Sequence, residues 1–241
     1  MQFILDIHNH TVNSGHAYST IMENAAFAAS IGLTHIGIAD HAPAMPGGAH
    51  LYHFANLWIL PEVIHGVRVL KGVEANILNI NGDVDLDAAL LKKMDFVIAS
   101  LHRGVFPPTD SETHTKAIIN AMENPNVHIL GHPGDSWFPI DVEAVVKAAA
   151  RTNTIIEINE KTLDPGSYRY MSEEFFVNMI ELCMAHNVPI LASSDAHFAT
   201  LVGDVPRAKK LIEKLNVNEE LVLNTCSNRL FAALQKVGQT K

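Results

Sequence analysis

Three histidines lie within nine residues directly after the first apolar run of the chain, residues 2–7: they are His8, His10 and His16. In an extended segment, residues two positions apart point to the same side, so His8 and His10 can share one metal ion. A lone histidine at such a place is more often a turn or core residue than a ligand. The interpretation therefore depends on the residues at the ends of the other apolar runs.

The chain contains seven short apolar or β-branched runs that are typical of strands, with helical patterns between them. The runs cover residues 2–7, 34–40, 67–75, 95–100, 126–131, 153–159 and 188–194. A polar or metal-type side chain closes or follows each run. For the second to the seventh run, in chain order, these side chains are Asp40 and His41, Glu74, His102 and Arg103, His132, Asn159 and Glu160, and Asp195 and His197.

Strands that alternate with helices predict parallel pairing through right-handed crossovers. An open doubly wound sheet would suit the same alternation, but the sequence has no glycine-rich phosphate turn of the Rossmann or P-loop type. We therefore predict an α/β fold, a closed or nearly closed seven-stranded (β/α) barrel formed by a single domain over residues 1–241. Active sites of such barrels lie at the C-terminal rim of the strands, where the polar side chains should converge. The Pro- and Gly-rich stretch 41–54 is expected to be a loop over the barrel mouth.

Composition and charge limit the classes of partner. The chain of 241 residues carries 17 Lys and Arg against 26 Asp and Glu, a net charge of −9. This acidic balance disfavours binding to an extended nucleic-acid backbone. No segment approaches the roughly 20 apolar residues of a membrane span, and no signal peptide precedes the first run, so we expect a cytoplasmic protein without a membrane partner. The two cysteines, Cys183 and Cys226, are expected to be reduced and partly buried.

The candidate ligands are too many for a single ion. A catalytic zinc takes about three protein ligands and leaves one position open, whereas nine residues are available here. Nine fit three divalent ions if one carboxylate bridges two of them, and Glu74, from the middle of the ring, is the best bridge. Imidazole-rich coordination favours Zn²⁺, with Mn²⁺ and Fe²⁺ as alternatives. The nine residues are His8, His10, His16, His41, Glu74, His102, His132, Asp195 and His197.

Through these residues and the motifs around them, the sequence resembles a known family, the PHP phosphoesterases (polymerase and histidinol phosphatase superfamily). The resemblance runs from the first strand to the last and is closest to the compact bacterial stand-alone phosphatases. It implies a distorted (β/α)7 TIM-like barrel with a trinuclear metal site at the C-terminal rim. The matching motifs are HNH at 8–10, His16, ADH at 39–41, GVE at 72–74, SLH at 100–102, GHP at 131–133 and SSDAH at 193–197.

The resemblance also implies how the ligands are divided. One ion would take His8, His10, Glu74 and Asp195, a second would take Glu74, His102 and His132, and a third would take His16, His41 and His197. Two ions that share Glu74 would hold a bridging hydroxide for in-line attack on phosphorus, so Glu74 and Asp195 count as catalytic residues. The third ion would stabilise negative charge on the phosphoryl group. The expected reaction is hydrolysis of a small phosphomonoester.

Two residues beside the ligands are further catalytic candidates. Asp40, next to His41, is expected either to accept a hydrogen bond at the site or to donate a proton to the leaving group. Arg103, next to His102, is expected to orient the phosphate with its forked N–H donors. The residue types do not identify the substrate, and homo-oligomerisation is left open.

Three alternative functions remain at this point. An amidohydrolase-type deaminase or amidase also places an HxH pair after its first strand, but it would leave His16 and His41 without a role. A nucleotide phosphatase or exonuclease of the same superfamily often carries an inserted domain, whereas only 27 residues separate Glu74 from His102 here. A non-enzymatic, metal-stabilised interaction module is disfavoured because the ligand set is complete.

Overall fold

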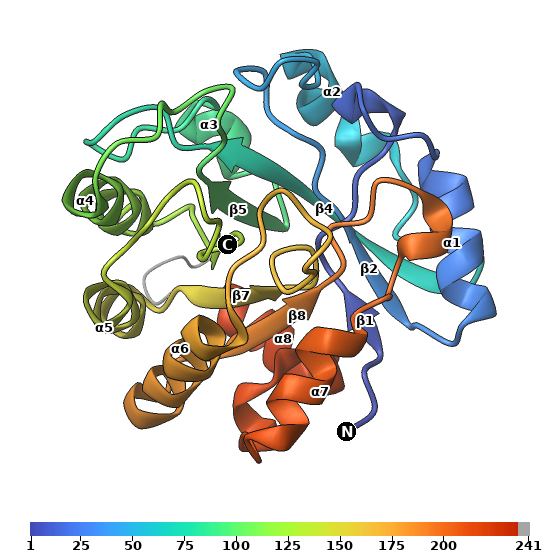
Figure 1. Ribbon diagram of the computed structural model, residues 1–241. Helices are drawn as coiled ribbons and strands as arrows, with labels where there is room; N and C mark the ends of the chain where they lie inside the picture. The colour runs from blue at the N-terminus through green and yellow to red at the C-terminus, as the bar shows by residue number, and fades with distance from the viewer. Residues whose placement is uncertain (236–241) are drawn as a thin grey trace.

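A computed structural model describes residues 1–235 and consists of a ring of parallel strands surrounded by helices (Figure 1). The strands are two to five residues long except for β4, which has ten. Their bounds are β1 Leu5–Asp6, β2 His35–Ile38, β3 Val63–Ile64, β4 Val67–Asn76, β5 Phe96–Ser100, β6 Ile129–Leu130, β7 Ile155–Asn159 and β8 Ile190–Ser193. All seven predicted strands are present, although β1 and β6 are each only two residues long.

The strands follow the order β1-β2-β4-β5-β6-β7-β8, and every neighbouring pair is parallel. This confirms the predicted (β/α) barrel. The additional strand β3 forms a short antiparallel hairpin with β4, which the sequence patterns did not predict. No ladder joins β8 to β1 in the part of the chain that the structure describes; a single bridge between Asn9 and Ala196 joins their continuations. The barrel is therefore nearly closed.

The helices lie outside the ring and cover its apolar outer face (Figure 1). On α5, for example, Val142, Val145, Val146 and Ala149 are buried, the spacing of a single apolar stripe. A capping box formed by Thr20 and Glu23 begins α1. The bounds are α1 Ile21–Ser30, α2 Leu51–Asn56, α3 Ala88–Leu91, α4 Ser111–Met122, α5 Val142–Thr152, α6 Glu173–His186, α7 Pro206–Lys214 and α8 Ser227–Leu234.

The stretch 41–54 is not entirely a loop, which corrects the prediction. Helix α2 begins at Leu51 because the His50 side chain accepts a hydrogen bond from the Tyr52 N–H and so caps the first turn. The Pro- and Gly-rich part, up to position 49, is irregular as expected. At the other end of the chain, the residue pattern over 227–237 predicts a final helix. This helix is observed to Leu234, and positions 236 and 237 lie outside the described residues.

Close packing around Phe96 requires glycine on the neighbouring strands. The Phe96 ring is fully buried and lies where a Cβ atom on Gly37 or Gly72 would have to be. Gly131 likewise faces the Ser100 hydroxyl too closely to carry a side chain. Neighbouring side chains therefore require glycine at positions 72 and 131.

The gap between β8 and β1 is sealed by polar side chains in place of strand pairing. The Asn224 amide donates to the carbonyl oxygens of Leu5 and Ala192, at 3.2 and 2.8 Å, and its oxygen accepts from the Ala192 N–H at 2.8 Å. The buried Asp6 carboxylate accepts from the Ser194 side chain and from the Gly203 N–H. These contacts satisfy backbone groups that an open sheet edge would leave unpaired.

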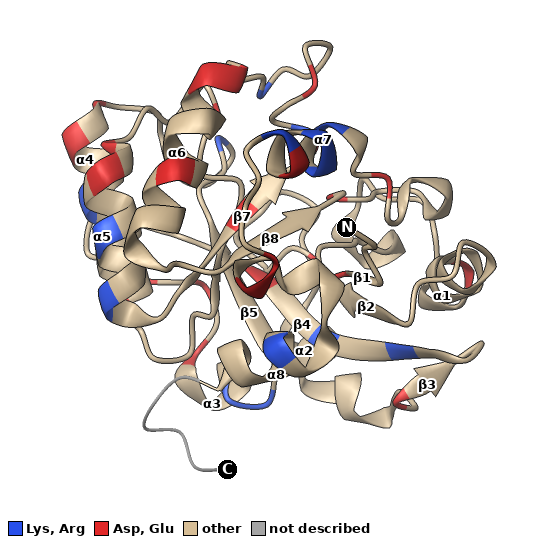
Figure 2. Ribbon diagram, turned by 90° about the horizontal axis from the view of Figure 1, so that it is seen from below, with Lys and Arg blue, Asp and Glu red and all other residues tan. Residues whose placement is uncertain are grey.

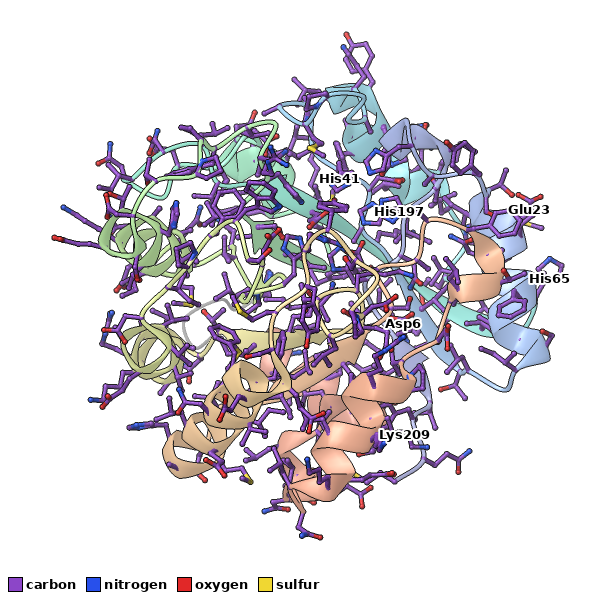
Figure 3. All side chains as sticks on the ribbon, viewed as in Figure 1. Asp6, Glu23, His41, His65, His197 and Lys209 are labelled. Atoms are coloured by element: carbon purple, nitrogen blue, oxygen red, sulfur yellow. The ribbon has the colours of Figure 1, made fainter. Side chains whose placement is uncertain are left out.

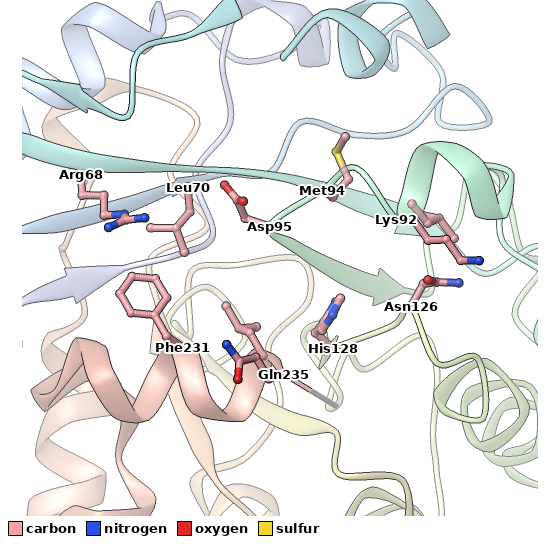
Figure 4. A pocket seen from close by; sticks show the side chains of 11 residues that line it. Arg68, Leu70, Lys92, Met94, Asp95, Asn126, His128, Phe231 and Gln235 are labelled. Atoms are coloured by element: carbon pink, nitrogen blue, oxygen red, sulfur yellow. The ribbon is translucent and has the colours of Figure 1, made fainter. Parts of the chain in front are cut away.

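A cavity of about 560 Å³ lies at the N-terminal end of the strands, between the barrel floor and α8 (Figure 4). Its walls include Arg68, Leu70, Asp95, His128 and Phe231. Because active sites of parallel barrels are built at the opposite, C-terminal rim, this cavity is separate from the predicted site.

Charged residues of both signs occur on the helices around the barrel (Figure 2). Asp and Glu occur on α4 and α6, and Lys and Arg occur on α5 and α7, so in this view the cations do not gather on a single face. Within residues 1–235, no helix has the combination of length and apolar composition that crossing a lipid bilayer would require.

Candidate metal centre and active site

Glu74 lies at the centre of the convergent histidines. It comes from the C-terminal part of β4, and its side chain is almost completely buried. Its two oxygens face different histidines, which is the arrangement that a bridging carboxylate needs. Oε1 lies 2.9 Å from His132 Nε2 and 3.2 Å from His102 Nε2, and Oε2 lies 2.6 Å from His41 Nδ1, 3.5 Å from His8 Nε2 and 3.6 Å from His10 Nε2.

Asp195, which follows β8, contacts two of the histidines that surround Glu74. Its Oδ1 lies 3.1 Å from His10 Nε2 and 3.7 Å from His8 Nε2. Its Oδ2 accepts a hydrogen bond from the Arg169 guanidinium. Asp195 and His132 both have positive φ angles, 53° and 28°. A non-glycine residue in this region is uncommon and is often found at functional sites, and here the strained backbone directs two candidate ligands into the centre.

The third predicted cluster is also assembled, on the more open side of the centre. His16 and His197 bring their Nε2 atoms to 2.9 Å from each other, and the His41 ring lies 5.0 Å from that of His16. The step from His10 to His16 is made by the 3-10 turn Val12–Ser14 and by Gly15 at φ 73°. In Figure 3, His41 and His197 lie near the middle of the view, whereas Glu23 and Lys209 lie on peripheral helices.

The second ring nitrogen of several histidines is held by a fixed partner. His8 Nδ1 donates to Glu157 Oε1 at 2.6 Å, and His102 Nδ1 donates to Asn76 Oδ1 at 2.7 Å. His10 Nδ1 lies 3.0 Å from the Ser14 hydroxyl. Such contacts fix the tautomer and aim Nε2 at the centre, as partners of metal-bound histidines do in other proteins.

Buried polar atoms without hydrogen bonds test whether this centre fits a metal. Among the described residues, His8 Nε2, His102 Nε2, His41 Nδ1 and Glu74 Oε2 are buried and make no hydrogen bond, although His41 and Glu74 approach closely. Leaving one buried polar group unpaired costs about 1–3 kcal/mol, so four together need an explanation. Divalent cations would satisfy all four. Three overlapping groups have the ligand spacing of a metal site: His8, His10 and Glu74; His41, Glu74 and His102; and His10, His41 and His197.

The electrostatics of the two carboxylates suit cation binding. Burial alone would raise the pKa of Glu74, but the neighbouring His102, His41 and His8 outweigh it and hold the pKa well below its usual value. Burial opposes ionisation of Asp195 in the same way, and Arg169 and His8 again hold its pKa well below the usual range. Both groups are therefore anionic at neutral pH.

The pKa values of the candidate histidine ligands are shifted in different directions. Burial lowers the pKa of His10 far below its usual value, and proximity to His41 adds to the effect. Burial likewise lowers the pKa of His16 and of His197. The pKa of His8 is raised despite its burial because Glu157, Glu74 and Asp195 surround it. Neutral imidazole is the form that binds a metal, so the low pKa values favour binding at neutral pH.

The predicted ligands are all brought together, but they differ in burial. Seven of the nine are buried, His197 is half-buried and His16 is exposed. Of the residues after the sixth strand, Asn159 lies near the centre, with its amide 3.4 Å from Asp195 Oδ2. Glu160 does not, because its carboxylate accepts from the Arg207 and Ala208 N–H groups at the start of α7.

Asp40 lies behind the ligands, with no side-chain exposure. Its carboxylate accepts from the Thr11 N–H, the Thr11 hydroxyl and the Ser14 hydroxyl, each at 2.7 Å. Burial raises its pKa, but the His53 side chain and these donors outweigh burial and bring the pKa to about 2. Of the two roles predicted for Asp40, this environment favours the hydrogen-bond acceptor over the proton donor.

Arg103 is exposed, and its guanidinium carbon lies 3.6 Å above the centre of the Trp137 ring.

The sequence analysis missed two other charged residues of the site, Glu157 and Arg169. Glu157 is a fully buried carboxylate inside the apolar strand β7, and its charge within that run was the available signal. Arg169 lies in the loop after β7, in no recognisable motif.

A family model for the PHP domain matches residues 6–164, which contain seven of the nine candidate ligands. The chain belongs to the PHP family. The motifs HNH, GVE, SLH and GHP all lie within the matched part, whereas SSDAH lies beyond it.

Curated relatives of this PHP chain cover nearly its whole length. It is 46% identical over 237 residues to a "probable phosphatase" of Caldanaerobacter subterraneus, covering 98% of this chain and 92% of the relative. It is 40% identical to a "probable phosphatase" of Clostridium novyi, covering 100% and 98% of the two chains. Together with the family match, these relatives support a hydrolase of the phosphatase type.

A solved structure shows the same barrel fold. The histidinol phosphate phosphatase of Lactococcus lactis, crystallised with zinc, L-histidinol and phosphate, superposes with a TM-score of 0.59 and covers 89% of this chain and 94% of its own. The sequence identity is 17%, so this likeness supports the fold. The retained barrel explains how residues scattered along this chain reach one rim.

Proposed function

We propose that this protein is a metal-dependent phosphatase that hydrolyses a small phosphomonoester at a trinuclear zinc centre. The observation that carries the proposal is the group of buried, unpaired histidine nitrogens around the anionic Glu74. The names of the curated relatives support the phosphatase class. The zinc in the Lactococcus lactis enzyme supports the choice of metal, and imidazole-rich coordination is what Zn²⁺ prefers.

Each ion would be held by a distinct set of residues, with Glu74 shared by two of them. The zinc ions would supply Lewis acidity and a nucleophile at neutral pH. The sets are His8, His10, Glu74 and Asp195 for the first ion, Glu74, His102 and His132 for the second, and His16, His41 and His197 for the third.

The remaining residues of the site hold the ligands and the substrate. Glu157 keeps the His8 ring in the orientation that turns Nε2 inward. Asp40 anchors Ser14, whose hydroxyl contacts His10, so it positions the segment after β1. Arg169 places a buried positive charge beside Asp195, and its Nε makes no hydrogen bond within residues 1–235. This donor is available to orient a phosphoryl oxygen of the substrate.

The proposal is tested by metal analysis together with turnover. Protein purified under metal-replete conditions should contain about three zinc ions per chain, as expected for nine ligands with one bridge, and should hydrolyse p-nitrophenyl phosphate. Chelation should remove the activity and zinc should restore it. His41→Ala should lose one ion and most of the turnover, whereas His186→Gln, at the exposed end of α6, should keep both.

A substrate panel then separates the candidate phosphoesters. Histidinol phosphate belongs in it because the Lactococcus lactis enzyme was crystallised with L-histidinol and phosphate, and small sugar and nucleotide phosphates complete it. Fewer than two transition ions per chain would contradict the trinuclear centre. Turnover of an amide or an aminopurine, with every phosphoester left intact, would replace the phosphatase proposal by a deaminase or amidase.

A further inference from the structure

Arg103 differs from every other arginine of the chain. Five of the six arginines pair with a carboxylate, whereas Arg103 has no carboxylate partner within residues 1–235. The chain has 26 acidic residues, so an unpaired guanidinium is not explained by a shortage of partners. The five pairs are Arg68–Glu62, Arg151–Glu123, Arg169–Asp195, Arg207–Glu160 and Arg229–Glu220.

Arg103 is held in place by an aromatic ring that is itself fixed. The guanidinium carbon lies 3.6 Å above the Trp137 ring. The indole Nε1–H donates to the Tyr168 carbonyl at 3.2 Å, and the Trp137 backbone N–H donates to Asp135 Oδ1 at 2.9 Å. Stacking occupies a face of the guanidinium and leaves the N–H donors at its edge free for an anion.

The three residues of this rim shelf, Arg103, Trp137 and Tyr168, come from the loops after β5, β6 and β7. Arg103 directly follows the candidate ligand His102, and Tyr168 directly precedes Arg169, which contacts Asp195. The shelf therefore stands beside the metal centre, at the mouth of the barrel.

The two arginines near the centre have different environments. Arg169 is buried and ion-paired to a candidate ligand, which places it beside the candidate metal centre. Arg103 is exposed and fixed further out by stacking. A second cation at the rim matches a second negative charge on the substrate, separated from the phosphate that reacts.

We propose that the rim shelf of Arg103, Trp137 and Tyr168 binds a second anionic group, a carboxylate or a phosphate, on the organic part of the substrate. This inference rests on the proposed phosphatase function and narrows its substrate class to phosphomonoesters with a further negative charge. Arg103 supplies the charge and the N–H donors, and Trp137 is a positioning residue.

The test compares two homologous series of substrates. One series contains ω-carboxyalkyl phosphates of increasing chain length, and the other contains n-alkyl phosphates of the same lengths. The measured quantity is the ratio of kcat/KM values for each matched pair. At the best chain length the protein should prefer the carboxylated substrate by roughly tenfold to a hundredfold, as expected for charge-assisted hydrogen bonds, mainly through KM. A third series of alkane bisphosphates shows whether a phosphate is preferred to a carboxylate.

Variants assign the preference to the shelf. Arg103→Met should bring the ratio close to one, Arg103→Lys should restore part of it, and Trp137→Leu should lower it because the guanidinium loses its support. Arg151→Met, a paired arginine of α5 on the outer surface, is the matched control and should keep the full ratio. A ratio near one for the unmodified protein at every length, or an equal loss on both series in Arg103→Met, would overturn the inference. The second result would mean that Arg103 acts on the reacting phosphate.

Binding of non-hydrolysable analogues separates this inference from the proposed function. The zinc-loaded protein is titrated with ω-carboxyalkyl phosphonates and with alkyl phosphonates of equal length. Preferential binding of the carboxylated analogue that disappears in Arg103→Met supports the shelf, even if no phosphoester is hydrolysed. Hydrolysis of phosphoesters with equal binding of both analogues would keep the phosphatase and refute the shelf.

Discussion

Glu157 illustrates how a residue outside the ligand set controls the centre. It accepts from His8 Nδ1, from the His132 N–H and from the Ser193 hydroxyl, so it contacts two candidate ligands directly. Burial would raise its pKa, but the neighbouring His8 outweighs burial and keeps the pKa below its usual value. The carboxylate is thus a fixed anionic support for both histidines.

Replacing this support should weaken metal binding. We expect Glu157→Gln to lower the affinity for zinc by roughly 10- to 100-fold, because the amide keeps the shape but no longer provides a charged acceptor for His8. Competition with a chromophoric chelator measures the change. The matched control is Glu160→Gln, three positions further along, whose carboxylate fastens the start of α7. It should lower thermal stability and leave zinc affinity unchanged; equal zinc affinity in both variants would contradict the role given to Glu157.

The two thiols should differ in reactivity. Burial raises the pKa of Cys183 to about 12, and Cys226 is only partly buried. Because the thiolate is the reactive form, iodoacetamide at pH 8 should modify Cys226 in the native protein and leave Cys183 intact. Peptide mapping by mass spectrometry reads out the sites, and the urea-unfolded protein should react at both. Equal modification in the native protein would contradict the buried position of Cys183.

At the scale of the elements, the seam between β8 and β1 depends on the Asn224 side chain. Asn224→Ala should lower the free energy of unfolding by about 3 kcal/mol or more, because several buried backbone groups lose their partner. Urea denaturation measures the loss. Asn218→Ala, at an exposed turn, is the control and should change stability by less than about 1 kcal/mol. An equal effect of both substitutions would show that the seam does not depend on Asn224.

The seven parallel strands could be predicted because each is a short apolar run that ends in polar residues. The same polar endings indicated the ligands, since strand ends meet at one rim. Strand β3 and helix α2 escaped prediction because their local signals are too short. The apolar run of β3 is only Val63 and Ile64, between Glu62 and His65, whereas β1 and β6 lie in longer apolar runs. Helix α2 begins only with a histidine cap. Arg169 and Trp137 escaped for another reason. Both lie in irregular loops, and only the folded chain brings them beside the ligands.

At the scale of the whole molecule, the barrel separates two regions with different roles. The C-terminal rim collects the titratable ligands, and the opposite end holds the cavity of about 560 Å³, which is lined in part by Phe231 and Leu234 of α8. The glycines at 37 and 72 make room for the Phe96 ring. The residues that pack the interior and the residues that form the candidate site are therefore different residues of the same strands.

The seam between β1 and β8 has candidate metal ligands on both of its sides. His10 and Asp195 are 185 residues apart in sequence, on the two sides of the gap between β1 and β8, and they meet at 3.1 Å. A zinc ion held by both would tie the first strand to the last, much as a cross-link closes a large loop. Metal binding and closure of the strand ring would then be coupled. The ion would stabilise the barrel as well as take part in catalysis.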